Sequence, residues 1–215
     1  FTGSTLVGKK IASQCAETLK PHLLELGGKD PMIVLKDANI NRSVESALFG
    51  GLSNAGQTCI STEEVFIEDS IYDSFVEKIS NRIKDIKSGG KNNDLGSMIM
   101  PKNTDKVKRQ IKEAKDGCRI IQGKGEDGEM FIPPTLVLNP SDNLSIVNEE
   151  TFGPVISLRP FSNEKELIKM LHKTGYGLSS SIFGRNKSRI NQIVKQIKTG
   201  NVSVNDVLTH YGIAS

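Results

Sequence analysis

The sequence has few cysteines and histidines, and neither residue type is spaced for metal binding. Its 215 residues include only three cysteines, Cys15, Cys59 and Cys118, and three histidines. An odd number of irregularly spaced cysteines argues against a secreted disulfide framework and favours a reducing compartment. We therefore expect a cytoplasmic protein. No Cys or His pair has the short spacing of a metal site, so we expect no bound metal.

Long apolar runs and one-sided charge are also lacking. No run approaches the roughly 20 apolar residues that a membrane helix needs. The 28 basic and 25 acidic side chains are mixed along the chain and leave a net charge of +3. We therefore expect neither membrane nor nucleic-acid binding. With 36% hydrophobic residues, the composition is that of a globular chain long enough to bury a sizeable core.

Helical and strand-like segments alternate along the chain. Apolar residues at helical spacing predict helices over 4–17, 40–54, 72–86, 102–115, 164–171 and 187–197, the third stopped by the glycines at 89–90. Short apolar runs predict strands over 22–26, 31–35, 65–67, 119–121, 135–138, 155–158, 180–183 and 202–204. This alternation predicts an α/β fold with a mostly parallel sheet flanked by helices.

The first candidate segment lies at the start of the chain. Gly3 and Gly8 flank the opening of the first predicted helix, with Ser4 or Thr5 as its cap. Free backbone N–H groups and the helix dipole at such a start favour a phosphate group. By itself, the same pattern favours the alternative of a capped helix after a tight turn.

The second candidate is Glu25, followed by Leu26, Gly27 and Gly28. Glu25 is predicted to end a strand, where open α/β sheets bind their ligands. A carboxylate there could act as a general base if desolvation raises its pKa. A solvated Glu before a Gly-Gly turn is the alternative.

The third candidate is Cys59, which follows a glycine and polar residues at 54–58. A buried structural cysteine would lie in an apolar helical pattern, as Cys15 does. An exposed cysteine near backbone donors can be activated as a thiolate. The local sequence is compatible with a catalytic nucleophile and equally with a cysteine that has no catalytic role.

The fourth candidate is the acidic loop at 148–155. Glu149 and Glu150 precede Phe152 and a Gly-Pro pair that leads into a predicted strand. One interpretation is a carboxylate that binds a ligand hydroxyl while the phenyl ring stacks nearby. The other is a solvated acidic turn.

Taken together, the four segments resemble the aldehyde dehydrogenase superfamily. The motifs are Phe-Thr-Gly-Ser-Thr at 1–5, Glu-Leu-Gly-Gly-Lys at 25–29, Gly-Gln-x-Cys at 56–59 and Glu-x-Phe-Gly-Pro-Val at 150–155. The separation of 34 residues between Glu25 and Cys59 fits the family pattern, and residues 200–206 are similar to its late active-site segment. The resemblance covers essentially the whole chain.

The resemblance implies a function and a role for each candidate residue. The function is oxidation of an aldehyde to a carboxylic acid with NAD or NADP, through a thiohemiacetal and a thioester on the cysteine. The implied catalytic residues are the nucleophile Cys59, whose backbone N–H would form half of an oxyanion hole, and the general base Glu25. The implied cofactor-binding residues are Gly3 and Ser4 at the pyrophosphate, Leu26 and Gly27 along the nicotinamide, Glu150 at the ribose and Phe152 beside the nicotinamide.

The chain also departs from the family pattern. The family has an upstream segment with most of the dinucleotide domain and a downstream oligomerisation strand, which implies a homo-oligomer in the full-length form. We therefore expect residues 1–27 to be a remnant of a Rossmann-like cofactor domain and residues 28–215 a catalytic domain truncated at its C-terminus. Glu64 stands where the family commonly has Arg. Two alternatives to dehydrogenase activity follow for this chain. It could be a catalytic fragment with at most thiol esterase activity, or a non-enzymatic structural relic.

Overall fold

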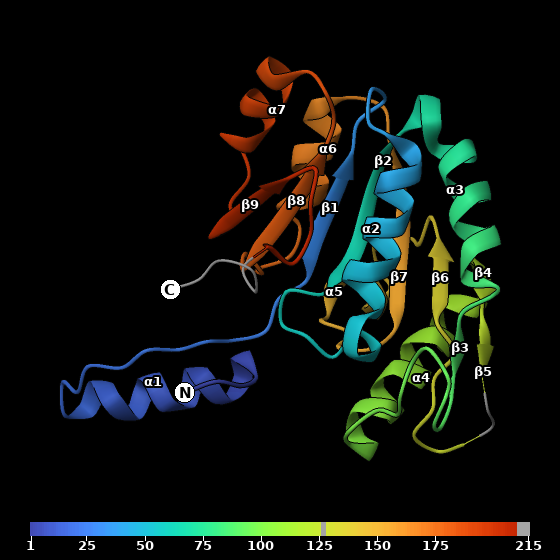
Figure 1. The fold of residues 1–215 in the computed structure, drawn as a ribbon. Coiled ribbons are helices and arrows are strands. Elements are labelled where there is room, and N and C mark those ends of the chain that lie inside the picture. The colour runs from blue at the N-terminus through green and yellow to red at the C-terminus, as the bar shows by residue number, and fades with distance from the viewer. Residues whose placement is uncertain (126–127, 210–215) are drawn as a thin grey trace.

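A seven-stranded sheet forms the centre of the computed structural model, which describes residues 1–125 and 128–209 (Figure 1). In spatial order its strands are β4 (Arg119–Gln122), β6 (Thr135–Leu138), β7 (Val155–Phe161), β2 (Thr62–Glu68), β1 (Asp30–Val34), β8 (Ser179–Phe183) and β9 (Asn201–Val204). All neighbouring strands pair in parallel except β4 and β6. The predicted mostly parallel sheet is thus confirmed. A separate parallel pair joins β3 (Lys87–Ser88) to β5 (Lys124–Gly125).

Helices cover both faces of this sheet. One face packs against α2 (Ile40–Leu52) and α3 (Asp69–Ile83). On the other face, α4 (Pro101–Lys115) and α5 (Ser145–Asn148) cover β6 and β7, and α6 (Glu164–Leu171) and α7 (Lys187–Val194) cover the centre. Side chains that alternate along β1 divide between the faces, because Met32 and Val34 join the first core and Ile33 joins the last. The strands are therefore buried on both sides.

The helix α1 (Thr5–Glu17) lies apart from the sheet (Figure 1). Its cap is Ser4, whose hydroxyl accepts a hydrogen bond from the Val7 N–H at 3.4 Å, as predicted for this position. Gly8 is its only buried residue. An extended connection leads from α1 to β1 and carries the Glu-Leu-Gly-Gly motif.

Several predicted boundaries are wrong. Residues 22–26 form no strand, and their one sheet-like contact is an isolated bridge between Glu25 and Thr2. The helix expected over 72–86 ends at Ile83, and the one expected over 40–54 ends at Leu52, where a 3-10 turn, η1 (Ser53–Gly56), follows. The last expected helix ends at Val194. Residues 210–215, the end of the predicted catalytic domain, lie outside the described part of the chain.

Candidate active site

The predicted site residues lie on loops that precede strands of the sheet. Residues 25–29 lead into β1, residues 57–61 into β2 and residues 149–154 into β7. Because these three strands are parallel, the three loops meet at the amino ends of the strands. The expectation that Glu25 ends a strand and lies at the carboxyl edge of the sheet is therefore wrong. The Glu-Leu-Gly-Gly motif instead precedes the strand β1.

Cys59 lies on an exposed turn that follows a short stretch of strained backbone. In η1, Asn54 and Ala55 both have left-handed φ angles near +54°, and Gly56 has φ +70°. A Cβ atom on Gly56 would lie 2.1 Å from the carbonyl oxygen of Gly153. Glycine is thus required at this position, both for its conformation and for the close contact with the loop before β7. Strain of this kind is typical of functional sites.

The electrostatic surroundings of Cys59 oppose its ionisation. Burial raises the pKa of the thiol, and the negative charges of Asp30 and then Glu25 raise it further. Hydrogen bonds from the backbone N–H groups of Cys59 and Ile60 act in the opposite direction. The sulfur therefore lies beside backbone donors, as a nucleophile requires, and beside two carboxyl groups whose charge disfavours a thiolate.

Glu25 is exposed and lies at the edge of a cleft of about 400 Å³. Its backbone pairs with the start of the chain, where its N–H donates to the Phe1 carbonyl at 2.9 Å and its carbonyl accepts from the Gly3 N–H at 3.0 Å. The cleft is also lined by Leu26, Gly27 and Tyr176. Although Glu25 is far from Cys59 in sequence, its negative charge contributes to the raised pKa of the Cys59 thiol.

The start of α1 differs from a free phosphate site. The Gly3 N–H is already bonded to Glu25, so it is not an open anion donor. Gly8 lies against Leu26, because a Cβ atom on Gly8 would come within 2.5 Å of Leu26 Cδ2. The second glycine of the pattern therefore allows α1 to pack on the Glu-Leu-Gly-Gly segment.

Glu150 reaches across to the same segment. Its Oε1 accepts the Gly28 N–H at 3.1 Å, and a Cβ atom on Gly27 would lie 2.3 Å from that oxygen. Burial raises the pKa of this half-buried carboxyl, and the nearby Glu63 adds to the effect. The carboxylate predicted to bind a ligand thus lies directly over the glycine pair.

A buried ion pair that sequence reasoning missed shapes the loop before β7. Lys29 Nζ lies 2.8 Å from Glu63 Oε2, and both side chains are almost inaccessible to solvent. Glu63 also accepts hydrogen bonds from the N–H groups of Thr151 and Phe152 at 2.8–2.9 Å. These bonds hold Phe152 at a left-handed φ of +54°. The Lys in Glu-Leu-Gly-Gly-Lys was the only signal of this pair in the sequence, because nothing local to Glu63 indicates its partners.

Glu64, the departure from the family pattern, has a partner of its own. Arg159 on β7 lies 3.5 Å from Glu64 Oε1, and its other nitrogen pairs with Asp142. The guanidinium lies over the Phe66 ring, 5.7 Å from its centroid. The reversed charge is therefore balanced from the neighbouring strand.

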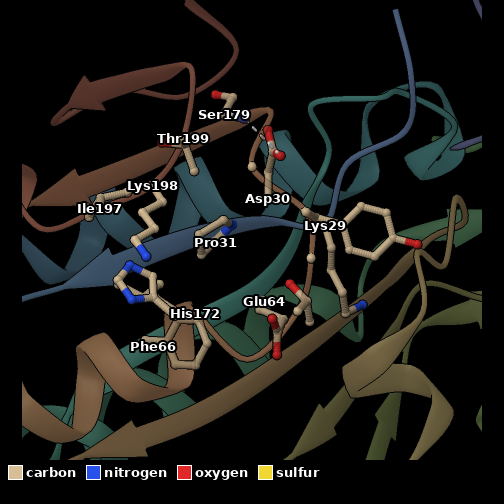
Figure 2. Close-up of a pocket in the computed structure, with 15 residues that line it drawn as sticks. Lys29, Asp30, Pro31, Glu64, Phe66, His172, Ser179, Ile197, Lys198 and Thr199 are labelled. Carbon is tan, nitrogen blue, oxygen red and sulfur yellow. Dashed lines mark hydrogen bonds between the residues drawn. The ribbon is translucent and has the colours of Figure 1, made fainter. Parts of the chain in front are cut away.

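A second cavity of about 300 Å³ lies behind the site (Figure 2). Lys29, Asp30 and Glu64 line it on one side, and His172 and Lys198 line it on the other. Within residues 1–125 and 128–209, no group of three or more His, Cys, Asp and Glu side chains could hold a metal ion. Among the helices of that same part, none combines the length and apolar character needed to cross a membrane.

Comparison with known proteins identifies a family for this chain. A family model described as the aldehyde dehydrogenase family matches residues 1–213. Glutarate-semialdehyde dehydrogenase of Pseudomonas putida is 33% identical over the whole chain, and the NADP(+) succinate-semialdehyde dehydrogenase of Escherichia coli is 35% identical over 95% of it.

Solved structures also match the chain over nearly its whole length. Betaine aldehyde dehydrogenase of Staphylococcus aureus, in complex with NAD+, matches 96% of the chain with a TM-score of 0.89 and 32% identity. An NADP-dependent enzyme of E. coli matches all of it with a TM-score of 0.91 and 34% identity. The chain spans 43–45% of the length of these four relatives. By sequence and by fold, the chain belongs to the aldehyde dehydrogenase family.

Proposed function

We propose that the whole protein oxidises an aldehyde to a carboxylic acid with NAD or NADP, and that this chain supplies the nucleophile and the general base. The observation that carries the proposal is the convergence of Cys59 and Glu25 at the amino ends of parallel strands. Membership of the family supports the reaction class. The relatives include enzymes for different aldehydes, so the proposal names the class of substrate and no single compound.

The residues around the cleft fit the nicotinamide end of a dinucleotide. Leu26 and Tyr176 offer apolar walls, and Gly27 carries no side chain between them and the Glu150 carboxylate. That carboxylate is suited to accept hydrogen bonds from ribose hydroxyl groups. The phosphate contact would come from Ser4 and the amino end of α1, since the Gly3 N–H is engaged. The separate position of α1 supports a domain boundary near Gly27.

In the proposed reaction, the Cys59 sulfur forms a bond to the aldehyde carbon and its proton leaves to solvent. The backbone N–H of Cys59 stabilises the resulting oxyanion, as one half of an oxyanion hole. A bound dinucleotide would supply the hydride acceptor for this carbon, and Cys59 would then hold the acyl group as a thioester. Glu25 then takes a proton from water, the water oxygen bonds to the acyl carbon, and the carbon–sulfur bond breaks to release the acid.

The proposal can be tested on this chain with an activated ester, which acylates a nucleophilic thiol without any dinucleotide. With p-nitrophenyl acetate we expect a burst of nitrophenol followed by slow turnover. Glu25→Gln should keep the burst and slow the later phase by about 100-fold or more, because it removes the base. Glu17→Gln, an exposed change on α1, is the matched control and should alter neither phase. A steady rate unaffected by Glu25→Gln would contradict the assignment of the base.

A further inference from the structure

Asp30, the first residue of β1, is a buried carboxyl group with an incomplete set of hydrogen bonds. Only 4% of its surface is exposed. Its Oδ1 accepts the N–H of Ser179 at 3.2 Å, and Figure 2 shows the side chain turned toward that residue. Its Oδ2 is buried without a hydrogen-bond partner among the described residues. Burying an ionised carboxylate with an unbonded oxygen carries a large desolvation free energy. The protonated, neutral form carries a much smaller one.

Asp30 is packed directly behind the proposed nucleophile. A Cβ atom on Gly28 would lie 2.4 Å from the carbonyl oxygen of Cys59 and 2.8 Å from Asp30 Oδ1, so Gly28 is held between the two residues. Among the carboxyl groups that act on the Cys59 thiol, Asp30 has the largest effect, ahead of Glu25. The mechanism proposed above gives Asp30 no role.

The charged groups around Asp30 favour its neutral form. Burial raises its pKa to about 8, and the negative charges of Glu63 and Glu150 contribute to the increase. The buried cation that precedes Asp30 in sequence, Lys29, is paired with Glu63. The cavity in front of Asp30 is bordered by Glu64, His172 and Lys198, and no ion pair joins Asp30 to a cation in the described part of the chain.

We propose that Asp30 is a positioning residue that holds a proton behind Cys59, so that the thiolate can form without a second buried anion beside it. The role rests on the proposed function of Cys59. Below the pH at which Asp30 ionises, the carboxyl is neutral and adds no negative charge beside the thiolate. Above that pH, the carboxyl releases its proton to solvent, and its charge suppresses the thiolate.

The test is the pH profile of Cys59 alkylation by iodoacetamide, followed by peptide mass spectrometry in a Cys15→Ser, Cys118→Ser background. Asp30→Asn keeps the shape and the acceptor for Ser179 but cannot ionise. Its alkylation should match the parent at pH 6.5 and be about 3- to 10-fold faster at pH 9, where only the parent carries the charge. Asp37→Asn, at the opposite end of β1, is the matched control and should leave the profile unchanged.

Identical profiles for Asp30→Asn and the parent between pH 6 and pH 10 would overturn the proposal, as would an equal acceleration at both pH values. Asp30→Ser removes the same charge with a smaller side chain and provides the same comparison if the amide variant does not fold. The readout needs no turnover. A failure of the ester assay would therefore count against the nucleophile, and an unchanged alkylation profile would count against Asp30.

Discussion

Residues 1–28 and the sheet region that follows them are held in place very differently. Gly8 is the only buried residue of α1, and Leu19 and Leu23 are 89% and 74% exposed. In β1, by contrast, Met32 and Ile33 are fully buried. The candidate site draws on both regions, since Cys59 is fixed to the sheet and Glu25 reaches it on the loosely packed connection. The structure thus fixes the nucleophile more firmly than the base.

The largest effect is expected in the sheet region, at the buried pair of Lys29 and Glu63. Glu63→Gln removes the carboxylate that pairs with the buried Lys29 ammonium, which should lower the free energy of unfolding by about 3–5 kcal/mol. Urea unfolding measures this change. The control is Glu45→Gln, which breaks an ion pair with Arg82 whose side chains are both 56% exposed. It should cost less than about 1 kcal/mol, and similar losses for both variants would contradict the difference expected between the buried and the exposed ion pair.

The next effect concerns pH and is specific to Asp30. Its pKa is raised from 3.8 to about 8 in the folded state, so the folded chain binds more protons than the unfolded chain between these values. The free energy of unfolding should therefore fall as the pH rises from about 4 to about 8. Asp30→Asn should reduce that slope, whereas Asp37→Asn should not. Urea unfolding at pH 5 and pH 8.5 gives the comparison, and parallel pH dependences for parent and Asp30→Asn would refute it.

A smaller, local effect is expected where the two regions meet. Gly8→Ala places a methyl group against Leu26, which should loosen α1 and leave the sheet unchanged. Amide hydrogen exchange in residues 5–17 should be roughly tenfold faster, with the exchange of β1 and β2 unaffected. Gly117→Ala, where a Cβ atom meets nothing within 4 Å, is the control. Equal protection of α1 in both variants would show that the contact contributes little.

The smallest effect is expected on the exposed side of the N-terminal region. Leu19→Ser removes a side chain that is 89% exposed, so the free energy of unfolding should stay within about 0.5 kcal/mol of the parent. Thermal or urea unfolding measures it. A loss above 1 kcal/mol would mean that Leu19 makes contacts that its exposure does not reveal.

Sequence reasoning predicted the sheet region and α1 well and the connection between them poorly. The bounds of β6 and α6 match the predicted 135–138 and 164–171, because their apolar periodicity reflects packing on the sheet. The predicted strand over 22–26 fails because its apolar residues have no sheet to pack on and Leu23 faces solvent. Local apolar content cannot distinguish a buried strand from an exposed connection.

The candidate site shows the same limit. The motifs identified Cys59, Glu25 and Glu150, and the structure places all three near the glycine pair at 27–28. They did not reveal Glu63, whose partners Thr151 and Phe152 lie 88 and 89 residues further along the chain. Asp30 was also missed, because its importance comes from burial rather than from a motif. Long-range partners and burial appear only after the chain folds.

We propose that Cys59 is the nucleophile and Glu25 the base of one site. The most direct measurement is peptide mass spectrometry of the Glu25→Gln chain after brief exposure to p-nitrophenyl acetate. Slow deacylation should preserve one acetyl group on the peptide that contains Cys59, with Cys15 and Cys118 unmodified. In the parent chain the same adduct should disappear as the ester is consumed. Acetylation spread evenly over the three cysteines, or an adduct equally stable with and without Glu25, would contradict the account.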